Sequence, residues 1–174
     1  MAKSLEMFFD PDTNAAIEEL WARLERGGVS SLATFSHRRH RPHVTLAVAD
    51  TLPITAAVLD AIGASRGMQV RMHGLGVFPG TDAVLFLGIT AASSLLNAHA
   101  EVHRAIGDCP HPWEHYLPGA WVPHLTLSMN LDGAALSRAI ALLYPFTVRQ
   151  AVIAQVGLVD VGTGDVIPLD LASS

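Results

Sequence analysis

The pentapeptide Pro-His-x-Thr-Leu occurs twice in this chain, at residues 42–46 and again at residues 123–127. In an extended strand, side chains at positions i and i+2 leave the same face, so each copy presents a histidine beside a threonine hydroxyl. The repeat therefore constrains the fold to one that brings two matching strands together. Such a fold would gather four polar side chains around one cleft: His43, Thr45, His124 and Thr126.

The pattern of apolar residues predicts two similar halves. Helical spacing with flanking caps and glycines predicts helices at 14–26, 53–62, 94–106 and after Asp132. Strands are predicted at 5–9, 32–35, 43–49, 69–77, 83–89, 124–130, 147–159 and 166–169. The order strand, helix, motif strand, helix, strand thus occurs over about 5–78 and again over about 83–160. We therefore predict one domain over 1–174 with a duplicated, pseudo-twofold, bilobal α+β fold, in which antiparallel sheets line a central cleft and helices lie outside.

Both motif strands predict which residues face the cleft. In the second strand, polar side chains alternate strictly with apolar ones from His124 to Leu131, which places Ser128 on the face of His124 and Thr126. In the first strand, Ala47 and Ala49 follow His43 and Thr45 on their face. Small residues there would leave room for a ligand.

Composition excludes several classes of protein. A formal net charge of −5 argues against broad contact with duplex nucleic acid, which needs clustered Lys and Arg, although a small or terminal phosphate remains compatible. The single Cys109 excludes an internal disulfide and fits a reducing compartment. The sequence has no run of 18 apolar residues, so no membrane span is expected. We expect a monomeric cytoplasmic protein, and the preference for arginine over lysine is common in GC-rich bacterial genomes.

Paired histidines suit acid and base catalysis. The unperturbed pKa of histidine lies near 6.5, so one ring can accept a proton while the other donates one. Cleavage of a phosphodiester needs both roles, together with donors that stabilise charge on the non-bridging oxygens. Thr45 and Thr126 are placed to be those donors. Alternatively, all four residues are ordinary strand residues, although the matched pair disfavours this interpretation.

With its two His-x-Thr-Leu motifs, the sequence resembles the two-histidine phosphoesterase superfamily, which includes the bacterial 2′-5′ RNA ligase family and 2′,3′-cyclic phosphodiesterases. Besides the two motifs, the segments 7–11, 76–79 and 121–124 are similar to that family. The resemblance implies a bilobal fold with a water-filled cleft, metal-independent chemistry without a cofactor, and catalytic roles for His43, Thr45, His124 and Thr126. One departure weakens the case for an RNA chain as substrate, because Ser128 and Met129 stand where many relatives that act on RNA carry Lys or Arg.

Four further residues are candidates for substrate binding: Arg39, Arg41, Phe78 and Ser128. The two arginines belong to the only dense basic cluster, residues 38–41, which either attracts a phosphate at the mouth of the cleft or forms a solvated loop. Phe78 either stacks on a nucleobase, as the resemblance suggests, or belongs to the core. Tyr116 could line the cleft.

Two rival functions stay open. His99 and His103 are four residues apart on a predicted helix, and His111 and His115 repeat that spacing, so a metal-dependent hydrolase is conceivable. The order His-Ala-Glu-Val-His differs from the zincin arrangement, in which Glu follows the first His. A non-catalytic binder of nucleotides or RNA ends is the second rival. The leading hypothesis is a metal-independent phosphodiesterase that acts on a 2′,3′-cyclic phosphate or a 2′-5′-linked nucleotide, with RNA ligation as a possible reverse reaction.

Overall fold

Strands and helices alternate along the part of the chain that the computed structural model describes, residues 2–169. In chain order the elements are β1 (Lys3–Phe9), α1 (Pro11–Arg26), η1 (Leu32–Thr34), β2 (His43–Ala49), α2 (Ala56–Gly63), β3 (Gln69–Phe78), β4 (Ala83–Ile89), α3 (Ser93–Ile106), η2 (Glu114–Tyr116), β5 (His124–Leu131), α4 (Gly133–Leu143), β6 (Arg149–Asp160) and β7 (Val166–Pro168). The labels η1 and η2 denote short 3₁₀ helices. The four predicted helices are all present.

Polar caps fix where three of the helices begin. The side chains of Asp10, Thr55 and Asp132 each accept a hydrogen bond from a main-chain N–H in the first turn of α1, α2 and α4. Such a cap satisfies one of the donors that a helix start leaves without a partner. Helix α1 begins earlier than the predicted residue 14, because Asp10 is the cap and Pro11 follows it at the first helical position.

The strand predicted at 32–35 is wrong. Leu32–Thr34 forms the 3₁₀ helix η1, and the Ser31 hydroxyl accepts a hydrogen bond from Ala33 N at its start. The Glu25 carboxylate also accepts hydrogen bonds from Ser31 N and from the Thr34 hydroxyl. These contacts from the end of the preceding helix hold the segment in a turn that its apolar residues alone do not indicate.

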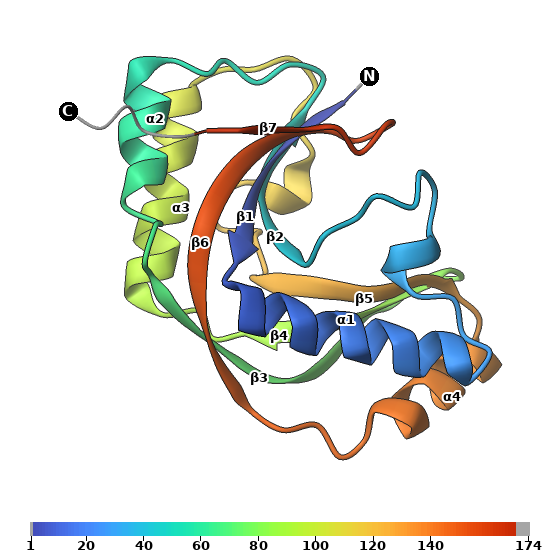
Figure 1. Ribbon diagram of the computed structural model, residues 1–174. Coiled ribbons are helices and arrows are strands. Elements are labelled where there is room, and N and C mark those ends of the chain that lie inside the picture. The colour runs from blue at the N-terminus through green and yellow to red at the C-terminus, as the bar shows by residue number, and fades with distance from the viewer. Residues whose placement is uncertain (1, 170–174) are drawn as a thin grey trace.

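The strand order of the sheet is pseudo-twofold symmetric, because each strand of one half of the chain has a counterpart from the other half at the matching place. Its strands follow the order β2-β1-β6-β3-β4-β5, all neighbours are antiparallel, and β7 pairs with β6. Replacing β1, β2 and β6 by β4, β5 and β3 gives the same order in reverse. Strand β6 curves through both parts of the sheet, and β2 and β5 form its two ends (Figure 1). The predicted α+β, pseudo-twofold fold is confirmed, and the single-domain assignment with its exact halves stays a proposal.

Helices pack in pairs, each pair combining the two halves of the chain. Helix α1 packs with α4, and α2 packs with α3 (Figure 1). The α1–α4 pair also contacts β5, whereas α3 contacts β2. Buried side chains from both pairs join those of the strands in a continuous apolar core. Both motif strands therefore have one face against helices and the other turned inward, toward the cleft.

Both motif strands carry a bulge at the leucine of the repeated pentapeptide. Leu5 pairs with Ala47 and the next residue, Glu6, pairs with Thr45, so Leu46 is passed over. In β4 and β5, Leu85 pairs with Ser128 and Phe86 with Thr126, so Leu127 is passed over in the same way. A bulge shifts the alternation of side chains by one residue. Beyond it, Val48 and Met129 line the cleft instead of the residues that strict alternation predicts.

Candidate active site

A cavity of about 290 Å³ lies between the motif strands. Strands β1, β2, β5 and β6 line it together with two loops that include residues 35–40 and 113–116. Three of the four predicted catalytic residues, His43, Thr45 and Thr126, line this cavity. The fourth, His124, adjoins it through Tyr116, which lines the cavity and stacks against the His124 ring with 6.5 Å between centroids. The two motifs are therefore brought to one cleft.

The main-chain carbonyl just before each motif holds the histidine of that motif. His43 Nδ1 lies 2.6 Å from the carbonyl oxygen of Arg41, and His124 Nδ1 lies 2.7 Å from that of Val122. Because a carbonyl oxygen only accepts hydrogen bonds, Nδ1 of each ring carries a hydrogen and donates it. Nε2 is then the nitrogen that can accept or release a proton. Both halves use the same contact to the residue two positions earlier.

The surroundings of His124 lower its pKa. Loss of solvent lowers the pKa of His124, the hydrogen bond to Val122 opposes this, and the nearby His43 and His115 lower the pKa further. Phe78 and Phe86 contact the ring edge-on, with centroids 4.8 and 5.3 Å away. An imidazole in such surroundings favours its neutral form, which is the form that can accept a proton.

A buried hydrogen bond joins the two motif regions. The indole Nε1 of Trp121, in the segment that leads into β5, donates to the carbonyl oxygen of Thr45 at 3.0 Å. The same indole stacks on His99 of α3, with centroids 3.9 Å apart and an angle of 4° between the rings. This contact supplies a donor to the outer edge of β2, an end strand of the sheet.

The two histidines of α3, His99 and His103, contact the main chain of β2. Nε2 of His99 and Nε2 of His103 lie 3.1 and 3.0 Å from the carbonyl oxygen of Leu46, the bulged residue. Burial and the neighbouring His103 lower the pKa of His99 to about 4, so this ring is neutral near pH 7. His111 instead pairs with Asp50 at 2.7 Å. Within residues 2–169, no group of three or more His, Cys, Asp or Glu side chains is arranged to hold a metal ion.

The predicted substrate-binding residues lie outside the cavity lining. Arg39 pairs with Asp165 at 2.6 Å on the surface, and Arg41 lies 4.3 Å above the ring of Phe8. Phe78 stacks on Phe86, with 4.3 Å between the ring centroids. The expectation that Ser128 faces the cleft is wrong, because the bulge at Leu127 turns this side chain into the protein.

Ser128 is completely buried, and its hydroxyl donates to the carbonyl oxygen of Ser30. Ala47, its counterpart in β2, also lies in the core, as does Ala49. The sequence did not identify Glu6, Trp113 and His37 as cleft residues, although all three line the cavity. His40, which also lines it, belongs to the cluster 38–41, for which one interpretation was a loop at the mouth of the cleft. An acidic residue within the apolar run 5–9 was the only available signal for Glu6.

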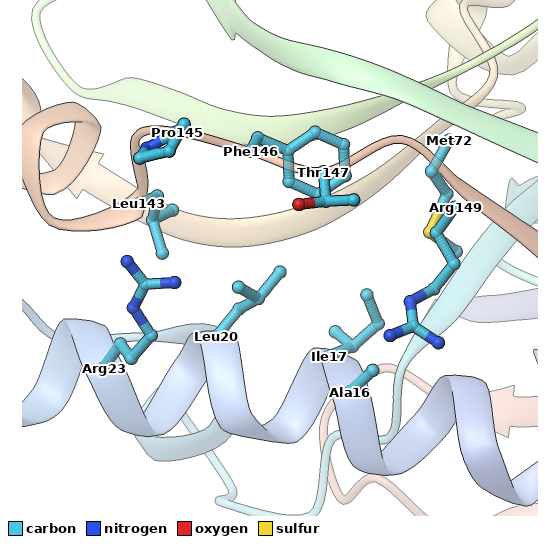
Figure 2. Close-up of a pocket in the computed structure, with 10 residues that line it drawn as sticks. All are labelled: Ala16, Ile17, Leu20, Arg23, Met72, Leu143, Pro145, Phe146, Thr147 and Arg149. Carbon is cyan, nitrogen blue, oxygen red and sulfur yellow. The ribbon is translucent and has the colours of Figure 1, made fainter.

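A second hollow, of about 130 Å³, lies between α1 and the segment that follows α4 (Figure 2). Apolar side chains such as Leu20 and Phe146 form its walls, and the guanidinium groups of Arg23 and Arg149 lie at its two sides. None of its lining residues also lines the histidine cavity. Over residues 2–169, the structure contains no helix with the length and apolar character that crossing a membrane requires.

Comparison with known proteins supports the fold. A family model described as the 2′-5′ RNA ligase superfamily matches residues 9–164. The structure of Usb1 from Kluyveromyces marxianus is similar, with a TM-score of 0.53 and 12% sequence identity over 98% of each chain. A second structure of that protein, with uridine monophosphate, has a TM-score of 0.48 and 13% identity over 98% of each chain. No curated protein sequence matches the chain.

Proposed function

The chain belongs to the 2′-5′ RNA ligase superfamily of two-histidine phosphoesterases, and from this membership we propose that it is a metal-independent phosphodiesterase. Its proposed substrate is a 2′,3′-cyclic phosphate or a 2′-5′-linked nucleotide. His43 and His124 are the acid and base, and Thr45 and Thr126 stabilise the charge that develops on the phosphate. RNA ligation is a further proposed activity, in which a 5′-hydroxyl takes the place of water and forms a bond to the phosphorus of a 2′,3′-cyclic phosphate as the bond to the 3′ oxygen breaks, which leaves a 2′-5′ linkage.

In the proposed hydrolysis, one histidine Nε2 accepts a proton from water as the water oxygen forms a bond to phosphorus. The other Nε2 donates a proton to the sugar oxygen as the bond between that oxygen and phosphorus breaks. The two protons balance, and exchange with solvent restores both rings. Hydroxyl groups of Thr45 and Thr126 donate to the non-bridging oxygens, which carry more charge in the transition state.

One observation carries this proposal more than any other: both motif histidines donate Nδ1–H to a carbonyl two residues earlier. A binding site alone has no need for two rings that keep the same nitrogen available. The hydroxyls of Thr45 and Thr126 in the wall of the same cavity add support.

The cavity favours a small substrate. Its volume of about 290 Å³ lies at the lower end of the usual range for small-molecule sites. Among the described residues, neither lysine nor arginine lines it, so a polyphosphate would find no such permanent positive charge there. We propose Phe78 as a substrate contact near His124, and Arg39 and Arg41 as outer contacts for a terminal phosphate.

We also propose that the protein is monomeric and cytoplasmic, and that it acts on nucleotides or RNA ends rather than on duplexes.

Turnover of a panel of 2′,3′-cyclic nucleotides and 2′-5′-linked dinucleotides tests the proposal, with the products identified. His43→Ala and His124→Ala are each expected to reduce turnover by about 10²–10⁴-fold, and Thr45→Val and Thr126→Val by about 10–10³-fold. Activity is expected to persist after prolonged EDTA treatment. Glu19→Gln, a change on the exposed face of α1, is the control for nonspecific effects.

The outcomes separate the three candidate functions. Nucleotide binding without turnover would support a non-catalytic binder. Activity that is lost on chelation and restored by a divalent ion would support a metal-dependent hydrolase. Wild-type turnover in a folded His43→Ala or His124→Ala protein would exclude the acid–base assignment.

A further inference from the structure

The pseudo-twofold symmetry of the site is broken at one pair of matching positions. Glu6 of β1 pairs with Thr45 of the first motif, and Phe86 of β4 pairs with Thr126 of the second. Both pairs lie directly next to the bulge in their motif strand, so Glu6 and Phe86 occupy equivalent places. One motif therefore has a carboxylate as its neighbour and the other has a phenyl ring.

Glu6 is held close to His43. The residue is only 8% exposed, and one carboxylate oxygen accepts a hydrogen bond of 2.6 Å from the Ser4 hydroxyl. The other carboxylate oxygen lies 3.6 Å from His43 Nδ1. Burial raises the pKa of Tyr116, a hydrogen bond with Thr45 opposes this, and the negative charge of Glu6 raises it further. The carboxylate of Glu6 is therefore close enough to influence the charge of groups around the first motif.

His124 has an aromatic ring, Phe86, at the place where His43 has Glu6. Phe78, Phe86 and Tyr116 pack around the His124 ring. A positive charge on His124 would therefore be poorly solvated, whereas a positive charge on His43 would lie beside an anion. Opposite charges within about 4–6 Å favour the charged form, and apolar burial favours the neutral one.

We propose that Glu6 is a positioning residue that keeps positive charge on His43, so that His43 is the proton donor and His124 the proton acceptor. This inference rests on the proposed function. In the forward reaction His124 takes the proton of the attacking water, and His43 gives its Nε2 proton to the leaving oxygen. Glu6 itself exchanges no proton.

Other charged and titratable groups near the two rings do not remove this asymmetry. His40 stacks on His43 with 6.3 Å between centroids, and burial, with nearby His37 and His43, lowers the pKa of His40 to about 4. His40 is therefore neutral near pH 7. The Arg41 guanidinium lies over the Phe8 ring. On the other side, His43 and His115 both disfavour a second positive charge on His124.

Glu6→Gln tests the assignment because it removes the charge and keeps the shape. The alkaline limb of the kcat/KM profile reports the loss of the proton donor, and in this variant it is expected to move to lower pH by about one unit. The acidic limb, which reports the acceptor, is expected to stay in place. Glu6→Asp should restore part of the shift, and Glu19→Gln should change neither limb.

Histidine NMR titration gives a readout that does not depend on turnover. In Glu6→Gln the signal of His43 is expected to titrate about one unit lower than in the unmodified protein, and that of His124 to stay unchanged. An unmoved His43 signal, or a shift of the acidic limb alone, would overturn the inference. If the unmodified protein cleaves no phosphodiester, the proposed function fails, whereas the titration still decides whether Glu6 maintains the charge on His43.

Discussion

At the scale of single residues, the environment of His124 predicts the pH dependence of catalysis. Burial is the main cause that lowers the pKa of this ring below the ordinary value of 6.5. A proton acceptor must be neutral, so a lowered pKa keeps it active at lower pH, and the acidic limb of kcat/KM is expected below pH 6.5. Phe78→Ala exposes the ring and should move the limb upward. An acidic limb above the ordinary histidine value in the unmodified protein would contradict this assignment.

Trp113 is the residue best placed to hold a flat part of the substrate. It lines the histidine cavity, and it is 42% exposed although it is a large aromatic side chain. Stacking of a base on an aromatic ring contributes about 1–3 kcal/mol, so Trp113→Ala is expected to raise KM by roughly 10-fold or more while kcat changes little. Steady-state kinetics with Trp113→Phe should give an intermediate KM. Tyr144→Ala, at a 74% exposed aromatic outside the cavity, is the control, and equal effects would refute the role.

At the scale of elements, α3 is coupled to β2 through His99. The pKa of this ring is lowered to about 4 by burial and by His103, whereas in the unfolded chain it is near 6.5. As the pH falls from 6.5 toward 4, the unfolded state therefore takes up a proton that the folded state does not. This ring alone should reduce the free energy of unfolding by about 2 kcal/mol between pH 7 and pH 5.

His99→Phe keeps the stacking on Trp121 and removes the titrating group. Denaturant unfolding at both pH values should show a smaller loss of stability at pH 5 in this variant than in the unmodified protein. His111→Phe, at an exposed histidine that pairs with Asp50, is the control for removing a histidine outside the core. An unchanged pH dependence in His99→Phe would mean that His99 does not limit acid stability.

Element boundaries could be predicted from the sequence where local chemistry decides them. Asp132 and Gly107 mark the start of α4 and the end of α3, and the alternation in 124–127 places His124 and Thr126 on one face. The bulges at Leu46 and Leu127 could not be predicted, because a bulge is defined by the partner strand. For that reason Ser128 was expected on the wrong face, and Glu6 became a candidate only once its pairing with Thr45 was known.

At the scale of the whole molecule, the proposed reaction requires the two lobes to keep a fixed position relative to each other. The strand order and the matching bulges give each lobe a motif strand with the same geometry. Catalysis in the proposed reaction needs both strands at one phosphate, and effective positioning is worth several kcal/mol. Contacts that cross from one motif region to the other should therefore affect turnover more than contacts of equal strength within a lobe.

Trp121→Phe tests this expectation, because it keeps an aromatic ring on His99 and removes the N–H that donates to the Thr45 carbonyl of the other motif. The buried carbonyl then loses a donor, so the free energy of unfolding should fall by about 1–3 kcal/mol. Turnover should fall by roughly 10-fold, because the Thr45 strand is less firmly fixed. The matched control is Trp21→Phe in α1, where the indole N–H is buried without a hydrogen-bond partner among the described residues. That variant loses no hydrogen bond and should keep its turnover. If denaturant unfolding and kinetics give the same values for both variants, the bond from Trp121 to Thr45 does not hold the two motifs together.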